Sequence, residues 1–322
     1  MSRSIRMMRL EAFLDLCRRC GRRPAVIQAG DSAVAATCGM EGRLFHARGG
    51  ELVSLFRPEA AEKISSAKNG YFNPGGDGLW PAPEGTTSGY EYATGAWRVP
   101  SGVVGAQYEI AEQGADHFAI TAEIDLINNR QLGLPCRFTR RARVRETSDG
   151  TTVIEQFDAI EYLGGRVLRH GEFLLAPWSL SQFAVNARSQ ARFGDPGAPV
   201  RDLYMPSGKL LSRDGDTMIM KHDRDNRIQL ALPEKSSFVE LRLPDRKLRI
   251  TRTSRVLAPE LAGVDIADAA PDQEPQSAVR FSIYNDPSGF MELEVAGGCT
   301  RELTPGTTLG VHITNTIQTM EE

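Results

Sequence analysis

The apolar positions along this chain change their spacing once. Near the N-terminus, Leu10, Phe13, Leu14 and Cys17 recur as they would along one face of a helix, so a short amphipathic helix is predicted there. Further along, the spacing becomes two, which is typical of strands with one buried face. In the segment Cys136 to Val144, apolar side chains share one face and several arginines share the other.

A series of short segments has this character, separated by turns rich in Gly, Pro, Asn and Asp. In chain order they are Ser32 to Thr37, Arg43 to Ala47, His117 to Ile127, Cys136 to Val144, Thr152 to Tyr162, Glu172 to Leu180, Thr217 to Lys221, Arg227 to Leu232, Phe238 to Leu243, Lys247 to Thr253, Val279 to Tyr284, Phe290 to Val295 and Thr307 to Gln318. No helical pattern lies between them. The sequence therefore predicts an all-β sandwich or barrel rather than alternating strands and helices.

Composition and charge exclude several classes of protein. The 322 residues carry 38 basic and 41 acidic side chains, a net charge of -3, so neither nucleic acid nor a membrane surface is an expected partner. No apolar run approaches the roughly 20 residues that cross a bilayer. Five cysteines with irregular spacing and no secretory signal favour reduced thiols and a cytoplasmic location. Cys17 and Cys20 form a lone C-x-x-C pair, so no metal or other cofactor is expected.

Two stretches interrupt the strand pattern. Ala258 to Ser277 is rich in proline and acidic residues and is predicted to be an exposed loop. Gly70 to Pro100 is also irregular, yet it carries six of the chain's 23 aromatic residues, namely Tyr71, Phe72, Trp80, Tyr90, Tyr92 and Trp97. Flat rings beside Asn73, Asp77 and Glu84 suit a sugar, whose C–H faces stack on aromatic rings and whose hydroxyls bind carboxylates and amides. The alternative is that these rings cap the end of the core.

Four short motifs carry a resemblance to a known family. They are Gly42-Arg43-Leu44 to Gly49-Gly50, Gly75-Gly76-Asp77-Gly78-Leu79-Trp80-Pro81-Ala82-Pro83-Glu84, Leu175-Ala176-Pro177-Trp178-Ser179-Leu180, and Phe290-Met291-Glu292-Leu293-Glu294-Val295 followed by Leu303-Thr304-Pro305-Gly306. In this order they resemble uncharacterised relatives of the aldose 1-epimerase, or galactose mutarotase-like, superfamily. The resemblance implies an antiparallel β-supersandwich. The resemblance spans roughly Ala25 to Gln318, so together with the predicted N-terminal helix the chain is expected to have a helical extension over residues 1–24 and a single β domain over residues 25–322.

The resemblance also implies acid–base chemistry on a sugar. The family uses a glutamate near the C-terminus and a histidine from the middle of the chain. Glu292 and Glu294 alternate with apolar residues, so both point to one face of a strand, roughly 7 Å apart. Glu294 is preferred as the base because Leu293-Glu294 matches the family's leucine-glutamate step. The alternative is a pair of glutamates that face solvent on an outer strand.

Two positions depart from the family pattern. Trp178 stands where the family has its histidine, so His170, the nearest histidine, is the candidate acid. Gly78 replaces the arginine of the family's G-G-x-R-x-W motif, which removes a fork-shaped donor for substrate hydroxyls. Trp80 and Trp178 are expected to line one pocket, with Asp77 and Glu84 at its rim.

Three functional hypotheses remain open from the sequence. The first is an epimerase-like enzyme acting on a small-molecule carbohydrate. The second is a sugar-binding supersandwich without catalytic activity. The third is a β-sandwich interaction protein unrelated to sugars. A cleft lined by Trp80, Trp178 and Glu292 or Glu294 would favour the first two, and a histidine across it would favour the first.

Overall fold

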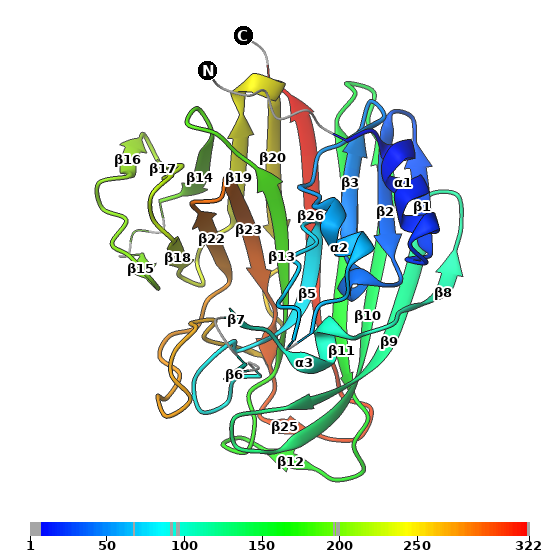
Figure 1. Ribbon diagram of the computed structural model, residues 1–322. Coiled ribbons are helices and arrows are strands. Elements are labelled where there is room, and N and C mark those ends of the chain that lie inside the picture. Colours follow the sequence, from blue (N-terminus) through cyan, green and yellow to red (C-terminus); the bar gives the residue numbers. More distant parts are fainter. Residues whose placement is uncertain are drawn as a thin grey trace.

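Two large antiparallel sheets lie face to face in the computed structural model, which describes residues 8–66, 68–90, 93–94, 97–195, 197 and 200–320 (Figure 1). The first sheet has the order β1 (Pro24–Ala29), β2 (Ser32–Thr37), β3 (Leu44–Arg48), β5 (Asp77–Ala82), β13 (Ala176–Ala184), β23 (Phe290–Ala296), β22 (Phe281–Asp286), β18 (Ile228–Leu232) and β15 (Arg201–Asp202), with β4 (Glu51–Leu52) paired to β3. Apolar side chains from both sheets form one continuous core between them.

The second sheet is built from the longer strands. Its order is β16 (Leu211–Asp214), β17 (Thr217–Lys221), β14 (Gln190–Gly194), β19 (Phe238–Leu243), β20 (Leu248–Ser254), β26 (Thr308–Thr319), β11 (Thr152–Tyr162), β10 (Gly133–Glu146), β9 (His117–Ile127) and β8 (Glu109–Gln113). Three two-stranded sheets complete the strands: β6 (Ala93–Thr94) with β7 (Trp97–Arg98), β12 (Leu168–Arg169) with β25 (Glu302–Leu303), and β21 (Ala262–Gly263) with β24 (Gly298–Cys299). The predicted all-β antiparallel sandwich is confirmed.

The helices are few and short. They are α1 (Leu10–Arg19), α2 (Pro58–Glu62), α3 (Ser101–Val104) and the 3-10 turns η1 (Met40–Gly42) and η2 (Pro244–Arg246). The predicted N-terminal helix is confirmed as α1, which buries Phe13, Leu14 and Cys17. These side chains pack on apolar residues of β2 and β3, and Figure 1 shows α1 lying across that end of the first sheet.

Two segments differ from the sequence-based expectation. Residues 77–82 form the central strand β5, although their prolines and glycines had indicated irregular backbone. The segment Ala258 to Ser277 is not simply exposed, because its backbone binds the loop that follows β5. The amides of Gly85 and Thr86 donate to the carbonyls of Ala267 and Ala269 over 3.1 and 3.0 Å. Backbone hydrogen bonds of this kind fix a segment that has few apolar residues to bury.

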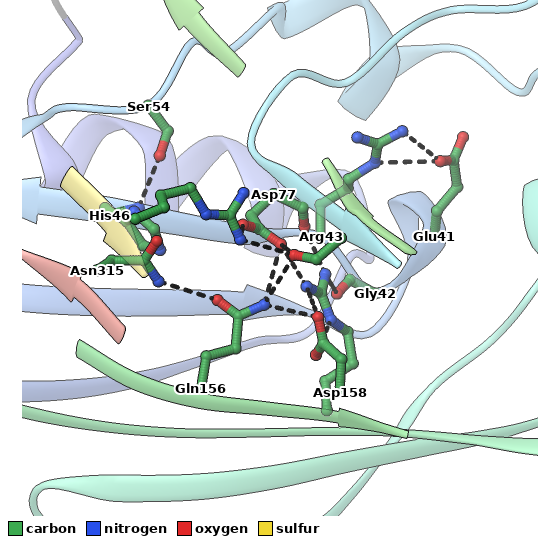
Figure 2. A network of polar contacts seen from close by, with 12 residues as sticks. Glu41, Gly42, Arg43, His46, Ser54, Asp77, Gln156, Asp158 and Asn315 are labelled. Atoms are coloured by element: carbon green, nitrogen blue, oxygen red, sulfur yellow. Dashed lines mark hydrogen bonds and ion pairs between the residues drawn. The ribbon is translucent and has the colours of Figure 1, made fainter. Parts of the chain in front are cut away.

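A network of charged side chains lies buried between the two sheets. Arg140 of β10 donates from Nε and Nη2 to the two carboxylate oxygens of Asp158 of β11, both over 2.9 Å, and also contacts Asp77 of β5. Arg252 of β20 lies 2.9 Å from the other oxygen of Asp77. All four side chains are fully buried. Figure 2 shows Asp77, Asp158 and the amide of Gln156 converging at this point.

His46 of β3 lies at one end of this network and has an unusual environment. It is fully buried, and neither ring nitrogen has a hydrogen-bond partner among the described residues. Burial lowers the pKa of His46 to about 4, and the positive charges of Arg252 and Arg140 act in the same direction while Asp77 opposes them. The folded protein therefore holds this histidine neutral.

A neutral buried histidine makes stability depend on pH. The unfolded chain takes up a proton near pH 6.5, whereas folded His46 does so only near pH 4. Its effect on the free energy of unfolding is therefore constant above pH 6.5 and becomes unfavourable as the pH falls from 6.5 to 4, by up to about 3 kcal/mol. Denaturant unfolding at pH 7 and pH 4.5 should show a smaller loss in His46→Leu than in the parent. Equal losses in the two proteins would contradict this assignment.

Candidate functional site

A pocket opens on the face of the first sheet that points away from the second sheet. Strands β5, β13, β23, β22 and β18 send alternate side chains into it, because successive residues of a strand point to opposite faces. The turn before β3, the loops before and after β5 and the loop before β18 close its sides. Its empty volume, counted to the open mouth, is about 460 Å³.

Most of the side chains singled out in the sequence line this pocket. Asn73, Trp80, Glu84, Trp178, Glu292 and Glu294 do so. They come from three separate parts of the chain, residues 73–84, 178 and 292–294, which the strand order β5-β13-β23 brings side by side. Of the other predicted aromatic residues, Tyr71 lines the pocket, Tyr92 lies outside the described residues, and so does the side chain of Trp97.

Asp77 and His170 lie elsewhere. Asp77 is three positions from Trp80 on the same strand, so the two side chains point to opposite faces and Asp77 enters the network between the sheets. It is not at the rim of the pocket. His170 lies on the exposed turn after β12, where its backbone amide donates to the carbonyl of Arg301 over 2.8 Å. No histidine lines the pocket in the described part of the chain.

Two tryptophans form one wall. Trp80 and Trp178 occupy directly paired positions of β5 and β13, and their rings meet edge to face with centroids 6.3 Å apart. Both are almost fully buried. Trp80 Nε1 donates to Glu41 Oε2 over 3.3 Å, and Trp178 Nε1 donates to Glu294 Oε2 over 3.2 Å. These hydrogen bonds fix the ring planes at the pocket.

Two glutamates of β23 form the floor. Glu292 accepts from the amide of Gln182 over 2.7 Å, and Glu294 accepts from the amide of Gln229 over 3.0 Å. Burial raises the pKa of Glu294 well above its usual range, and the charge of Glu292 and a hydrogen bond between the two carboxyl groups raise it further. Burial also raises the pKa of Glu292, while its hydrogen bond with Glu294 and the charge of Arg43 oppose that shift. Of the two carboxyl groups, Glu294 therefore holds a proton more tightly.

Three further polar residues line the pocket that the sequence did not single out. They are Arg43, Gln182 and Gln229, which are 1%, 3% and 2% exposed. Each has one buried polar atom that finds no hydrogen-bond partner among the residues that the structure describes: Nη1 of Arg43 and Oε1 of both glutamines. Gln182 could have been found, because it lies four residues beyond Trp178 on one strand and therefore shares its face. No local signal identified Arg43.

An arginine held by two tyrosines lies at the other side of the pocket. The guanidinium of Arg227 is 3.9 Å from the ring centroid of Tyr204 and 5.3 Å from that of Tyr284. It donates to the hydroxyl of Tyr204 over 2.7 Å and to that of Tyr284 over 2.9 Å. The three side chains give this side a polar surface that is held in place by stacking and hydrogen bonds.

The site has no evident place for a metal. Among the described residues, no three His, Cys, Asp or Glu side chains gather as metal ligands would.

In the same part of the chain, no helix is long and apolar enough to span a membrane. The groups that the pocket offers for chemistry are its carboxyl, amide, guanidinium and aromatic side chains.

Comparisons with known proteins agree on the fold. No protein-family model matches the chain, and no curated protein sequence matches it. Among solved structures, a candidate aldose 1-epimerase from Escherichia coli K12 has a TM-score of 0.55 at 9% identity, with 92% of this chain and 99% of that chain covered. A galactose mutarotase-like protein from Lactobacillus casei has a TM-score of 0.52 at 12% identity, with coverages of 92% and 100%. The Slr1438 protein from Synechocystis has a TM-score of 0.55 at 14% identity, with 99% of each chain covered. The architecture of this chain is thus the galactose mutarotase-like β-sandwich.

Proposed function

We propose that the pocket binds a sugar and interconverts its anomers. The observation that carries this proposal is the buried pair Glu292 and Glu294, which faces the same pocket as Trp80 and Trp178 and in which burial raises the pKa of both groups, that of Glu294 further. A proton donor and a proton acceptor beside an aromatic wall are the groups that opening a sugar ring requires. The similarity to structures described as aldose 1-epimerase and mutarotase-like proteins supports the same substrate class.

The unpartnered polar atoms also suit a sugar. Nη1 of Arg43 needs an acceptor, whereas Oε1 of Gln182 and Oε1 of Gln229 need donors. A hydroxyl group both donates and accepts, so a ligand with several hydroxyls satisfies all three atoms at once. Because a buried polar atom without a partner costs about 1–3 kcal/mol, binding such a ligand removes a cost that the empty pocket carries.

One proton donor and one proton acceptor in the pair Glu292 and Glu294 would supply the two proton transfers that the reaction needs. Ring opening removes the proton of the C1 hydroxyl, breaks the bond between C1 and the ring oxygen, and protonates that oxygen. Glu292 as a carboxylate accepts the first proton, and Glu294 as an acid donates the second. The pair then has its proton on Glu292. Closure onto the other face of the aldehyde runs both transfers backwards and restores the starting state without a proton from solvent.

A second function is favoured by one observation. The family that the sequence resembles uses a histidine, and no described histidine lines this pocket. A pocket that binds a sugar without catalysis would keep the aromatic wall and the amide acceptors and would need no second proton-transfer group. Measurements of exchange and of binding separate the two functions.

The test uses NMR exchange spectroscopy on a panel of aldoses that includes D-glucose, D-galactose and D-mannose. The proposal expects that the protein accelerates the exchange between the α and β anomers of at least one sugar over buffer. Binding without acceleration would support the second function. Neither binding nor acceleration for any aldose would contradict both.

Binding should depend on the aromatic wall. Trp80→Ala is expected to weaken the affinity for a bound aldose about 5- to 30-fold, which corresponds to the roughly 1–2 kcal/mol of a lost aromatic contact. Titration followed by tryptophan fluorescence or calorimetry measures the change. Phe157→Ala is the control, because Phe157 packs on His312 of β26 and does not line the pocket. If both substitutions leave the affinity unchanged, the wall does not contact the ligand.

A further inference from the structure

The turn before β3 has an uncommon backbone. Met40 and Glu41 both adopt left-handed conformations, with φ of 50° and 62°. Residues with a side chain rarely adopt this region, and two in succession are strained unless surrounding contacts hold them. The turn is fully covered, and it brings the side chain of Glu41 under the pocket wall.

Glu41 fixes the guanidinium of Arg43 at two of its three nitrogens. Glu41 Oε2 accepts from Nε over 3.1 Å and from Nη2 over 2.7 Å, and Figure 2 shows both contacts. The same oxygen accepts from Nε1 of Trp80, and Nη2 of Arg43 also donates to the hydroxyl of Tyr71 over 3.1 Å. Because the guanidinium is planar, holding Nε and Nη2 also fixes the direction of Nη1. Nη1 is the nitrogen that is buried and has no hydrogen-bond partner in the described part of the chain.

Gly78 leaves room for this arrangement. It lies two residues before Trp80 on β5 and therefore shares the pocket face. A Cβ atom at Gly78 would lie 2.5 Å from Nη1 and 2.6 Å from Cζ of Arg43, which is closer than atoms approach without displacement. The guanidinium of Arg43 thus fills the space above Gly78, the position at which the resembled motif carries an arginine.

We propose that Arg43 is a specificity-determining residue that donates from Nη1 to one hydroxyl of the bound sugar, with Glu41 as its positioning residue and Gly78 as the opening that admits it. This inference rests on the proposed function of the pocket as a sugar site. Since Glu41 already balances the charge of Arg43, the free nitrogen acts as a directed donor to a hydroxyl and not as a general anion trap. A sugar that lacks this hydroxyl would leave Nη1 unpaired in the complex.

The test compares the aldohexose that binds best among D-glucose, D-galactose and D-mannose with its monodeoxy derivatives, by calorimetry. In the unsubstituted protein, one monodeoxy derivative should bind about 10- to 100-fold more weakly than the complete aldohexose, because it lacks the hydroxyl that would accept a hydrogen bond from the charged donor. Arg43→Lys keeps a charge opposite Glu41 but loses the fork. Glu41→Asp keeps the charge pair, but its shorter side chain draws the guanidinium of Arg43 away from its position at the pocket. In both variants the discrimination against that same derivative should fall to a few-fold or less.

Arg246→Lys is the matched control. Arg246 is a partly buried arginine outside the pocket that donates to the carbonyls of Val53 and Leu52. The Arg246→Lys variant should leave the ratio of the affinities for the aldohexose and the monodeoxy derivative unchanged. The inference is overturned if Arg43→Lys weakens every derivative equally, which indicates a structural role, or changes no affinity. If the unsubstituted protein binds none of the sugars, the proposed function is overturned together with the inference. This result can be told apart from the two results for Arg43→Lys, in which the unsubstituted protein does bind sugar.

The close approach of Arg43 and Gly78 has a readout that needs no ligand. Gly78→Ala should lower the melting temperature of the parent. It should lower it less in the double variant Arg43→Met/Glu41→Gln, in which the obstructing guanidinium and its partner charge are both removed. Equal losses in the two backgrounds would show that Arg43 does not fill the space above Gly78, and the inference would fail on that ground.

Discussion

Asp77→Asn is expected to lower the free energy of unfolding by about 3–5 kcal/mol, the loss that follows when one partner of a buried ion pair is removed. Asp77 contacts both Arg140 and Arg252, and all three side chains are fully buried. Arg140 keeps Asp158 in the variant, but Arg252 loses the only carboxylate it pairs with among the described residues. Its charge would then remain in the core uncompensated. Denaturant unfolding of parent and variant at neutral pH measures the loss.

The sign of the pH dependence follows from the same contacts. Burial alone would raise the pKa of Asp77, but the charges of Arg252 and Arg140 outweigh it and hold the pKa below its usual range. The stability that Asp77 contributes is therefore fully present above the pKa of an unfolded aspartate and is lost as the pH falls below it. Asp116→Asn is the control, since Asp116 pairs with His117 and Arg143 at the surface. The Asp116→Asn variant should lose far less of the free energy of unfolding than Asp77→Asn. Comparable losses for the two variants would contradict the role of the buried network.

Glu292→Gln is expected to reduce the rate of anomer exchange about 10²- to 10⁴-fold, the usual effect of removing a general base. Glutamine keeps the shape of the side chain and its place beside Gln182, so the affinity for the sugar should change much less than the rate. Exchange NMR gives the rate and calorimetry gives the affinity. A Glu292→Gln protein with the parent's rate would show that this carboxylate does not move the proton.

Two further variants assign the partner roles. Glu294→Gln should also lower the rate, because a neutral amide replaces the acid. In the parent, activity should fall on the acidic side when Glu292 takes up a proton and on the alkaline side when Glu294 loses one, with apparent pKa values that belong to the pair. The alkaline fall should disappear in Glu294→Gln. His170→Ala should keep the full rate, since the side chain lies outside the pocket, and a large loss there would return His170 to the role of acid.

Much of the candidate site follows from alternation along single strands. Glu292 and Glu294 lie on one strand face because they are two residues apart, and their intervening neighbour Leu293 enters the core. The same rule, applied to the strand that contains Asp77 and Trp80, separates the two, because their spacing is odd. The sequence-based interpretation grouped them because it read the segment as a loop, in which no such rule applies.

The acid–base assignment needed the surroundings of each carboxyl group. From sequence, Glu294 was preferred as the base because of its neighbour Leu293. In the structure, Glu294 is the more deeply buried carboxyl group and the charge of Glu292 raises its pKa further, so we propose Glu294 as the acid and Glu292 as the base. The burial of Glu294 depends on strands β13 and β18, which come from distant parts of the chain and place Trp178 and Gln229 against its carboxyl group.

The sequence by itself determined the class of this protein and, in the segments that it predicted as strands, which residues share a face. Both are local properties, since the period of two is set within one strand and the turns by their own residues. Only the tertiary structure decided which strands are neighbours and in what register. That decision placed Trp178 opposite Trp80 and Gln182 opposite Glu292, brought the guanidinium of Arg43 over Gly78, and joined Asp77 to two arginines of the other sheet. The physical reason is that side chains from distant strands meet through sheet order, register and the packing of one sheet on another, none of which is encoded in the pattern of a single segment.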